Sequence, residues 1–157
     1  MKIKLLQIGK TNDEDLLSGI ARYEKRLASY VSFTCDTIPA LKDTSSFSSI
    51  QIKQKEGELL LNKFKNDDFV VLLDEKGKRF TSVAFARHIE QLQNQSTKQL
   101  VFVVGGAFGF SESVYSRAQM KLSLSDMTFS HQLIRLIFME QLYRAYTILN
   151  NHPYHNS

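Results

Sequence analysis

The sequence is poor in the residues that build disulfides, metal sites and membrane segments. Its 157 residues include one cysteine, Cys35, so no disulfide can form within the chain and no cysteine-based metal site is expected. The four histidines have no spacing typical of metal ligands, and we expect no metal. The N-terminal apolar run is too short for a signal peptide, and no segment approaches the length of a membrane span. These features predict a soluble cytoplasmic protein with no membrane partner.

Positive charge is only slightly in excess over negative charge. The formal net charge is +4, and lysines and arginines are interleaved with acids, so the balance indicates an anionic partner only weakly. Hydrophobic residues make up 43% of the chain, which is enough for one domain with a substantial core. We therefore expect residues 1–157 to form a single domain.

Short apolar segments alternate with stretches in which apolar residues recur at helical spacing. The run FVVLL at residues 69–73 has no polar interruption, as is typical of a strand buried on both faces of a parallel sheet. The alternation predicts an α/β fold with a parallel sheet flanked by helices. We expect strands at residues 2–8, 32–38, 69–73, 100–104 and 121–125.

Capping residues locate the expected helices between these strands. Residues 41–49 are expected to form a surface loop, and residues 75–78, EKGK, a turn. We expect helices after a cap at Thr11 or Asn12, at residues 52–64, after a cap at Thr81 or Ser82, after a cap at Ser111 or Ser113, and from His131 after a cap at Thr128 or Ser130.

Three of the expected strands end in segments suited to binding a ligand. These segments are residues 73–74, 105–106 and 124–129. Carboxyl ends of parallel strands meet at one edge of a sheet, where a crevice and a helix N-terminus can hold a small cofactor. Asp74 either accepts hydrogen bonds from that ligand or caps a turn, and its position favours neither interpretation.

The glycines after the fourth expected strand do not form a dinucleotide-binding fingerprint. Gly105, Gly106 and Gly109 lack the GxGxxG spacing, because Ala107 stands where the second glycine is needed. A dinucleotide-dependent oxidoreductase is therefore disfavoured. Glycines here let the backbone turn sharply and approach a ligand closely.

Four segments are distinctive when they are considered together: LLDEKGK, FVVGGAFG, LSLSDMTFSHQLIRLIFMEQLYRAYTIL and the terminal HPYH. With KIKLLQIGK and YEKRL near the N-terminus, they span nearly the whole chain. In these segments the sequence resembles the ribosomal RNA large subunit methyltransferase H family, within the knotted SPOUT methyltransferases. The resemblance implies a C-terminal trefoil knot, with a knotted cofactor-binding region at about residues 69–157.

The resemblance also implies an activity and its partners. A member of this family is a homodimer that uses S-adenosylmethionine to methylate N3 of pseudouridine 1915 in helix 69 of 23S rRNA. It acts on the assembled 70S ribosome. The cofactor-binding residues implied by the matching motifs are Leu73, Gly105, Gly106, Leu124, Ser125, Asp126, Met127, Thr128 and Phe129.

The sequence departs from the family pattern within the implied cofactor loop. Asp126 and Ser130 stand where other members carry different side chains, often proline at the second position. If the loop contacts the cofactor mainly through its backbone, these changes should be tolerated.

Methylation of an imide nitrogen needs a positioned cofactor and help with the N3 proton, because the imide is a weak acid. A general base, or a cation that stabilises the anionic ring, would serve. The implied catalytic residues are Arg144, Tyr154, His155 and His131; Arg135 and Glu140 are further candidates.

Structural explanations compete with each of these assignments. Glu140 and Arg144 have the i,i+4 spacing of a simple ion pair, and that is our interpretation of Glu140. His131 is suited to helix capping, and Tyr154 and His155 lie where chain ends usually fray. The family's matching Tyr-His pair favours a functional role for the last two. Arg144, whose planar fork suits a phosphate or a base, is the main candidate for RNA contact.

Helix geometry separates the two arginines of the last expected helix. At about 100° per residue, Arg135 and Arg144 lie on opposite sides, so they cannot serve one site within one chain. We expect a composite active site, in which the C-terminal tail of one subunit approaches the cofactor of the other. The main alternative function is a dimeric RNA- or nucleotide-binding module without turnover.

Overall fold

The computed structural model describes residues 1–156, so the predicted domain boundary at Ser157 lies outside the described residues. Within them, one parallel sheet contains all five strands in the order β2-β1-β4-β3-β5. The α/β prediction is confirmed. The strands are β1 (Lys2–Ile8), β2 (Ser32–Ile38), β3 (Phe69–Arg79), β4 (Gln99–Val104) and β5 (Met120–Ser123).

Strand β3 is longer than predicted, and the expected turn at residues 75–78 is wrong. The strand continues through this segment and pairs with β5, with a register shift between Leu73 and Lys78. Gly77 permits the close approach, because a Cβ there would lie 2.6 Å from backbone atoms of Lys121 and Leu122. Strand β5 ends at Ser123, two residues earlier than expected.

The helices form close to their predicted positions. The segment at residues 41–49 also contains a short 3-10 helix, η1 (Thr44–Ser46), where we expected a loop throughout. The helices are α1 (Glu14–Leu27), α2 (Ser49–Leu61), α3 (Ser82–Asn94), α4 (Glu112–Arg117) and α5 (Leu133–Leu149).

Side-chain caps explain most of these helix starts. Thr81 caps α3 and Ser111 caps α4. Each was one of the two residues predicted for that cap. Helix α1 is instead capped by Asp13, whose carboxylate accepts hydrogen bonds from two backbone amides of the first turn. Helix α5 starts two residues after His131, and Ser130 Oγ accepts a hydrogen bond from the Leu133 amide at 3.1 Å.

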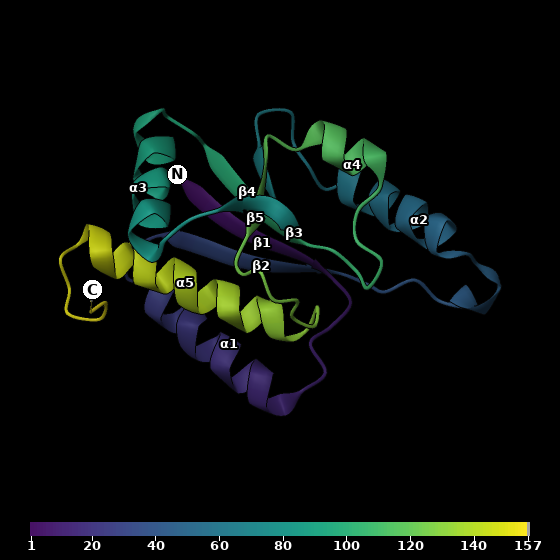
Figure 1. Cartoon of the computed structure of the whole chain (residues 1–157), viewed down its shortest axis with the longest axis horizontal. Coiled ribbons are helices and arrows are strands. Elements are labelled where there is room, and N and C mark those ends of the chain that lie inside the picture. The colour runs from purple at the N-terminus through teal and green to yellow at the C-terminus, as the bar shows by residue number, and fades with distance from the viewer. Residues whose placement is uncertain (157) are drawn as a thin grey trace.

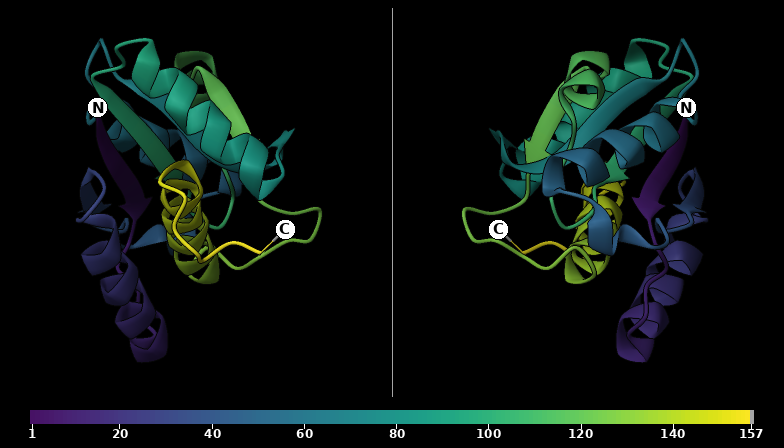
Figure 2. Two further views of the ribbon diagram at one scale, coloured as in Figure 1. Left: turned by 90° about the vertical axis from the view of Figure 1, so that its left-hand side faces the viewer. Right: turned by 90° about the vertical axis from the view of Figure 1, so that its right-hand side faces the viewer.

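Two helical layers cover the sheet. Helices α1, α3 and α5 lie on one face, and α2 and α4 lie on the other (Figure 1). Phe138 of α5 packs on Phe102 of β4 with ring centroids 4.5 Å apart, at the centre of the larger core. Helices α1 and α5 lie side by side (Figure 2). The arrangement leaves the carboxyl ends of β3, β4 and β5 at one edge.

Candidate active site

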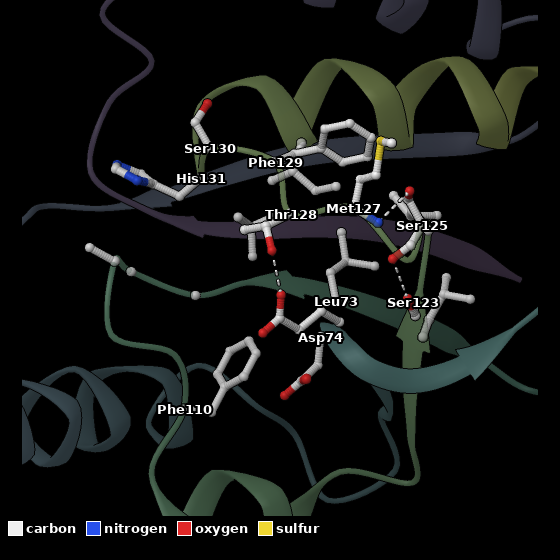
Figure 3. Close-up of a pocket in the computed structure, with 18 residues that line it drawn as sticks. Leu73, Asp74, Phe110, Ser123, Ser125, Met127, Thr128, Phe129, Ser130 and His131 are labelled. Atoms are coloured by element: carbon white, nitrogen blue, oxygen red, sulfur yellow. Dashed lines mark hydrogen bonds between the residues drawn. The ribbon is translucent and has the colours of Figure 1, made fainter.

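A cavity of about 370 Å³ lies at the carboxyl ends of β4 and β5, beside the middle of β3 (Figure 3). Its wall is built from residues 73–75 of β3, the glycine turn after β4, the loop between β5 and α5, and the first turn of α5. Of the residues implied for cofactor binding, those that line it are Leu73, Gly105, Gly106, Leu124, Ser125, Met127, Thr128 and Phe129.

Asp126 does not line this cavity. Its carboxylate is exposed and pairs with Arg79 at the end of β3. The neighbouring Thr128 donates a hydrogen bond to Glu75 Oε2 at 2.8 Å, also on β3 (Figure 3). These two contacts attach the loop to the strand. Within the loop, Ser125 Oγ accepts a hydrogen bond from the Met127 backbone amide at 2.9 Å. The Asp126 side chain therefore fixes the loop rather than facing the cavity.

The carboxylate of Asp74 lies at the cavity wall but is already engaged by protein donors. It accepts hydrogen bonds from the Tyr115 hydroxyl and, at 2.8 Å, from the backbone amide of Lys76. Burial, together with the contact to Asp74, raises the pKa of Tyr115, which keeps the phenol protonated and donating. Asp74 thus supports the β3 extension through protein contacts, and no turn forms after it for it to cap.

The glycine pair after β4 is closely packed against side chains and has no unusual backbone conformation. In this turn Gly109 has a positive φ of 83°, whereas Gly105 and Gly106 do not. A Cβ on Gly105 would lie 3.0 Å from the Phe110 ring, which also lines the cavity. A Cβ on Gly106 would lie 2.4 Å from a carboxylate oxygen of Glu56. The turn is closely packed on both sides.

A second group of predicted residues gathers at the other end of α5. Arg144 donates to Glu140 Oε1 at 2.5 Å and lies 3.2 Å from His155 Nδ1. Tyr154 donates to the same Glu140 oxygen at 3.0 Å, and its hydroxyl lies 3.2 Å from that of Tyr23 on α1. Tyr154 and His155 are therefore held against α5, and Glu140 does more than form an i,i+4 pair.

The charges of this cluster are stabilised by its own contacts. The hydrogen bond to Glu140 raises the pKa of the Arg144 guanidinium. Burial is the main cause that raises the pKa of Tyr154, with Tyr23 and Glu140 adding to it. The cluster therefore presents a permanent cation stacked on a neutral phenol, with the Arg144 guanidinium 4.8 Å from the Tyr154 ring centroid. Such a pair suits contact with an anionic or aromatic group.

The cluster and the cavity are separated within one chain. Ile134 lines the cavity, and Arg144 lies ten residues further along α5, about 15 Å at 1.5 Å per residue. Of the four residues implied for catalysis, only His131 lines the cavity. A single chain does not bring Arg144, Tyr154 and His155 to it.

Comparisons with known proteins agree along the whole chain. The family profile described as "Predicted SPOUT methyltransferase" matches residues 1–155. The ribosomal RNA large subunit methyltransferase H of Christiangramia forsetii is 54% identical over 156 residues, covering 99% of each chain. The protein of that name from Parabacteroides distasonis is 53% identical with the same coverage. The chain belongs to the ribosomal RNA large subunit methyltransferase H family.

The fold of this methyltransferase H family member also occurs in a distant solved structure. A probable methylase family protein from Haemophilus influenzae Rd KW20 matches with a TM-score of 0.57 at 11% identity, over 99% of this chain and 70% of that chain. The family profile shows the predicted SPOUT fold, and this structural match agrees with it.

Two further features concern metal binding and membrane insertion. Among residues 1–156, no group of three or more histidine, cysteine, aspartate or glutamate side chains is placed to hold a metal ion. No helix in the same range is long and apolar enough to cross a membrane.

Arg135 is a structural residue, and its candidacy for catalysis is not supported by its position. Its side chain is fully buried and donates hydrogen bonds to the Ile8 carbonyl at 2.9 Å, the Gly9 carbonyl at 3.0 Å and Thr11 Oγ1 at 2.9 Å. Its guanidinium provides hydrogen-bond donors for the backbone carbonyls at the end of β1, where the chain leaves the sheet. The opposite placement of Arg135 and Arg144 on α5 agrees with helix geometry.

We expect Arg135→Ala to lower the free energy of unfolding by about 3 kcal/mol or more, because it removes the buried hydrogen bonds to the carbonyls of Ile8 and Gly9. The matched control is Arg79→Ala, whose exposed ion pair should contribute less than about 1 kcal/mol. Urea unfolding of both variants measures the difference. Equal changes in the free energy of unfolding would show that the buried hydrogen bonds of Arg135 contribute no more to stability than the exposed ion pair of Arg79.

Sequence reasoning missed Tyr23 as a member of the cluster. The sequence placed Tyr23 only on the apolar face of α1. Its hydroxyl lies within hydrogen-bond distance of the Tyr154 hydroxyl, and the Arg26 guanidinium lies 5.3 Å from its ring centroid. A tyrosine at a core-facing helical position was the available signal, because a buried hydroxyl usually needs a partner.

Proposed function

We propose that this protein methylates N3 of pseudouridine 1915 in helix 69 of 23S rRNA, using S-adenosylmethionine and acting on the assembled 70S ribosome. Its membership of the ribosomal RNA large subunit methyltransferase H family supports the reaction class. The observation that carries the proposal is the cavity between the middle of β3 and the ends of β4 and β5, to which the family's cofactor motifs converge.

The residues of this cavity suit the cofactor. Its volume of about 370 Å³ lies within the usual range for small-molecule sites. Gly105 and Gly106 bring backbone to the wall, and the loop from Leu124 to Phe129 offers backbone groups and apolar side chains. Every lining residue falls within the region of about 69–157 that the family's trefoil knot would occupy, and the knot is part of the proposal.

Bound S-adenosylmethionine supplies the methyl group for an in-line displacement. The chain's own task is then to fix the target ring at attack distance and to stabilise the charge left on it when N3 loses its proton. Arg144 would provide that positive charge or bind an RNA phosphate. Tyr154 and His155 would position the ring, and His131, at the cavity wall, would face the same substrate.

This assignment requires a homodimer. Because about 15 Å of α5 separates Arg144 from the cavity in one chain, the cluster of one subunit would complete the cavity of its partner. The proposal includes this composite site.

Calorimetry with S-adenosylmethionine, followed by a methyl-transfer assay on unmodified ribosomes, tests the proposed function. We expect saturable cofactor binding and transfer of the methyl group to 23S rRNA. Cofactor binding without transfer would support the binding-module alternative instead. Absence of cofactor binding would contradict the assignment of the cavity.

A further inference from the structure

A second cavity, of about 350 Å³, adjoins the first. Gly106, Ala107 and His131 line both cavities, so ligands in the two would lie next to one another. The rest of its wall comes from the end of β1, residues 40–44, helix α2 and Phe108. The proposed cofactor site does not use this space.

Glu56 of α2 supplies an unusual group to this second cavity. The residue as a whole is only 6% exposed, and its carboxylate has no hydrogen bond or ion pair to protein within residues 1–156. Neither carboxylate oxygen is among the fully enclosed polar atoms without a partner, so the group is open to the cavity. Its oxygens lie directly against Gly106, where an added Cβ would meet them at 2.4 and 2.6 Å. Burial raises the pKa of the carboxyl group, and no nearby charge offsets that effect. Buried carboxyl groups are normally paired, so this one is available to a donor on a ligand.

The rim of the second cavity is suited to a flat heterocycle. Phe108 is 50% exposed there, and an aromatic ring at a pocket rim can stack on a base. Gln132 also lines the cavity, and its side-chain amide is fixed because it donates to the Lys10 carbonyl at 3.1 Å and accepts from the Asn12 backbone amide at 2.9 Å. Enzymes that modify a base hold it out of its stack in such a pocket and contact its edge by hydrogen bonds.

We propose that the second cavity holds the target pseudouridine ring and that Glu56 accepts a hydrogen bond from its N1–H. This inference rests on the proposed function. Pseudouridine is joined to its ribose through C5, so its N1–H is a free donor that uridine lacks. N1 and N3 flank the same carbonyl carbon, so N1 can face Glu56 while N3 points into the cofactor cavity at the boundary that Gly106 and His131 line from both sides.

Glu56 would then be a specificity-determining residue. With uridine in the cavity, position 1 carries the glycosidic bond, and the buried carboxyl group remains without a donor. A site built to bind a substrate N–H discriminates strongly against an analogue that lacks it, because its own polar group is left unpaired. The protein should therefore prefer ribosomes carrying pseudouridine at the target position over ribosomes carrying uridine there.

The test compares kcat/KM for methyl transfer to these two kinds of ribosome, in the wild-type protein and in Glu56→Met and Glu56→Gln. Met has a similar size but no acceptor, and Gln keeps a carbonyl acceptor. We expect Glu56→Met to reduce the preference for pseudouridine at least about 10-fold, as expected for a lost hydrogen bond to a charged group. Glu56→Gln should retain part of the preference.

Two further readouts separate specificity from structure and from the proposed function. The thermal midpoints of both variants at pH 7 should not fall, because each removes a buried carboxylate without a partner. A Glu56→Met variant with lower kcat/KM on both substrates by the same factor, or with an unchanged preference, would overturn this proposal. Failure of the wild-type protein to methylate either kind of ribosome would overturn the proposed function itself.

Discussion

Arg144→Ala should lower the rate of methyl transfer by at least about 100-fold while leaving the affinity for S-adenosylmethionine unchanged. Removing a positioned donor from a developing anion typically costs about 100- to 1,000-fold. Arg144 does not line the cofactor cavity and is held by Glu140 and His155, so its loss should not disturb cofactor binding. Single-turnover transfer to ribosomes and calorimetry with the cofactor measure the two effects separately.

Two variants serve as controls for this result. Arg144→Lys retains the charge but loses the planar fork, so an intermediate rate is expected. Arg87→Ala removes an exposed arginine of α3 that lies outside the cluster and should leave the rate within about 2-fold, as is usual for surface positions away from a site. Equal rates for Arg144→Ala and Arg87→Ala would remove Arg144 from the active site.

Mixing two inactive variants should restore activity if the site is shared between subunits. The pair is Arg144→Ala and Gly105→Val, the second of which would crowd the Phe110 ring and fill the cavity. In a mixed dimer, the intact cavity of one subunit meets the intact Arg144 of the other. Random exchange of subunits makes half of the dimers mixed, each with one working site of two, so about a quarter of wild-type activity is expected from this statistical argument.

The mixed-dimer experiment has a clear contrary outcome. Differently tagged variants, purified through both tags, would demonstrate that mixed dimers have formed. If such dimers remain inactive, each subunit must use its own Arg144, and the composite site is wrong. An additional mixture of Arg144→Ala with Tyr154→Phe supplies the matched control, because both changes lie in one cluster. There, the dimer retains an intact cavity but no intact cluster.

Local patterns were sufficient to predict five strands in a parallel sheet, but not the length of β3. The bounds of β1 and β2 match the prediction, because apolar residues, a following glycine and a following proline mark their ends in the sequence. The error at residues 75–78 has a long-range cause. EKGK has the composition of a turn, but Gly77 lets the segment lie against β5, which is more than forty residues away in the chain. A contact between segments so far apart in the chain cannot be predicted from the residues around EKGK alone.

The candidate site was predictable in part. Converging strand ends indicated a cavity, and the family resemblance indicated the loop that forms much of its wall. The outward direction of Asp126 depends on Arg79, and the burial of Arg135 depends on the carbonyls of β1. Neither partner is close in sequence. Glu56 was noted only as part of a helical stretch, although an acid beside a buried helix face could have indicated a site.

The central claim is the methylation of one pseudouridine of 23S rRNA, and nucleoside mass spectrometry tests it most directly. Unmodified ribosomes would be incubated with this protein and S-adenosylmethionine carrying an isotopically labelled methyl group. We expect label in 3-methylpseudouridine from helix 69. Label in a different nucleoside, or no label although the cofactor binds, would contradict it.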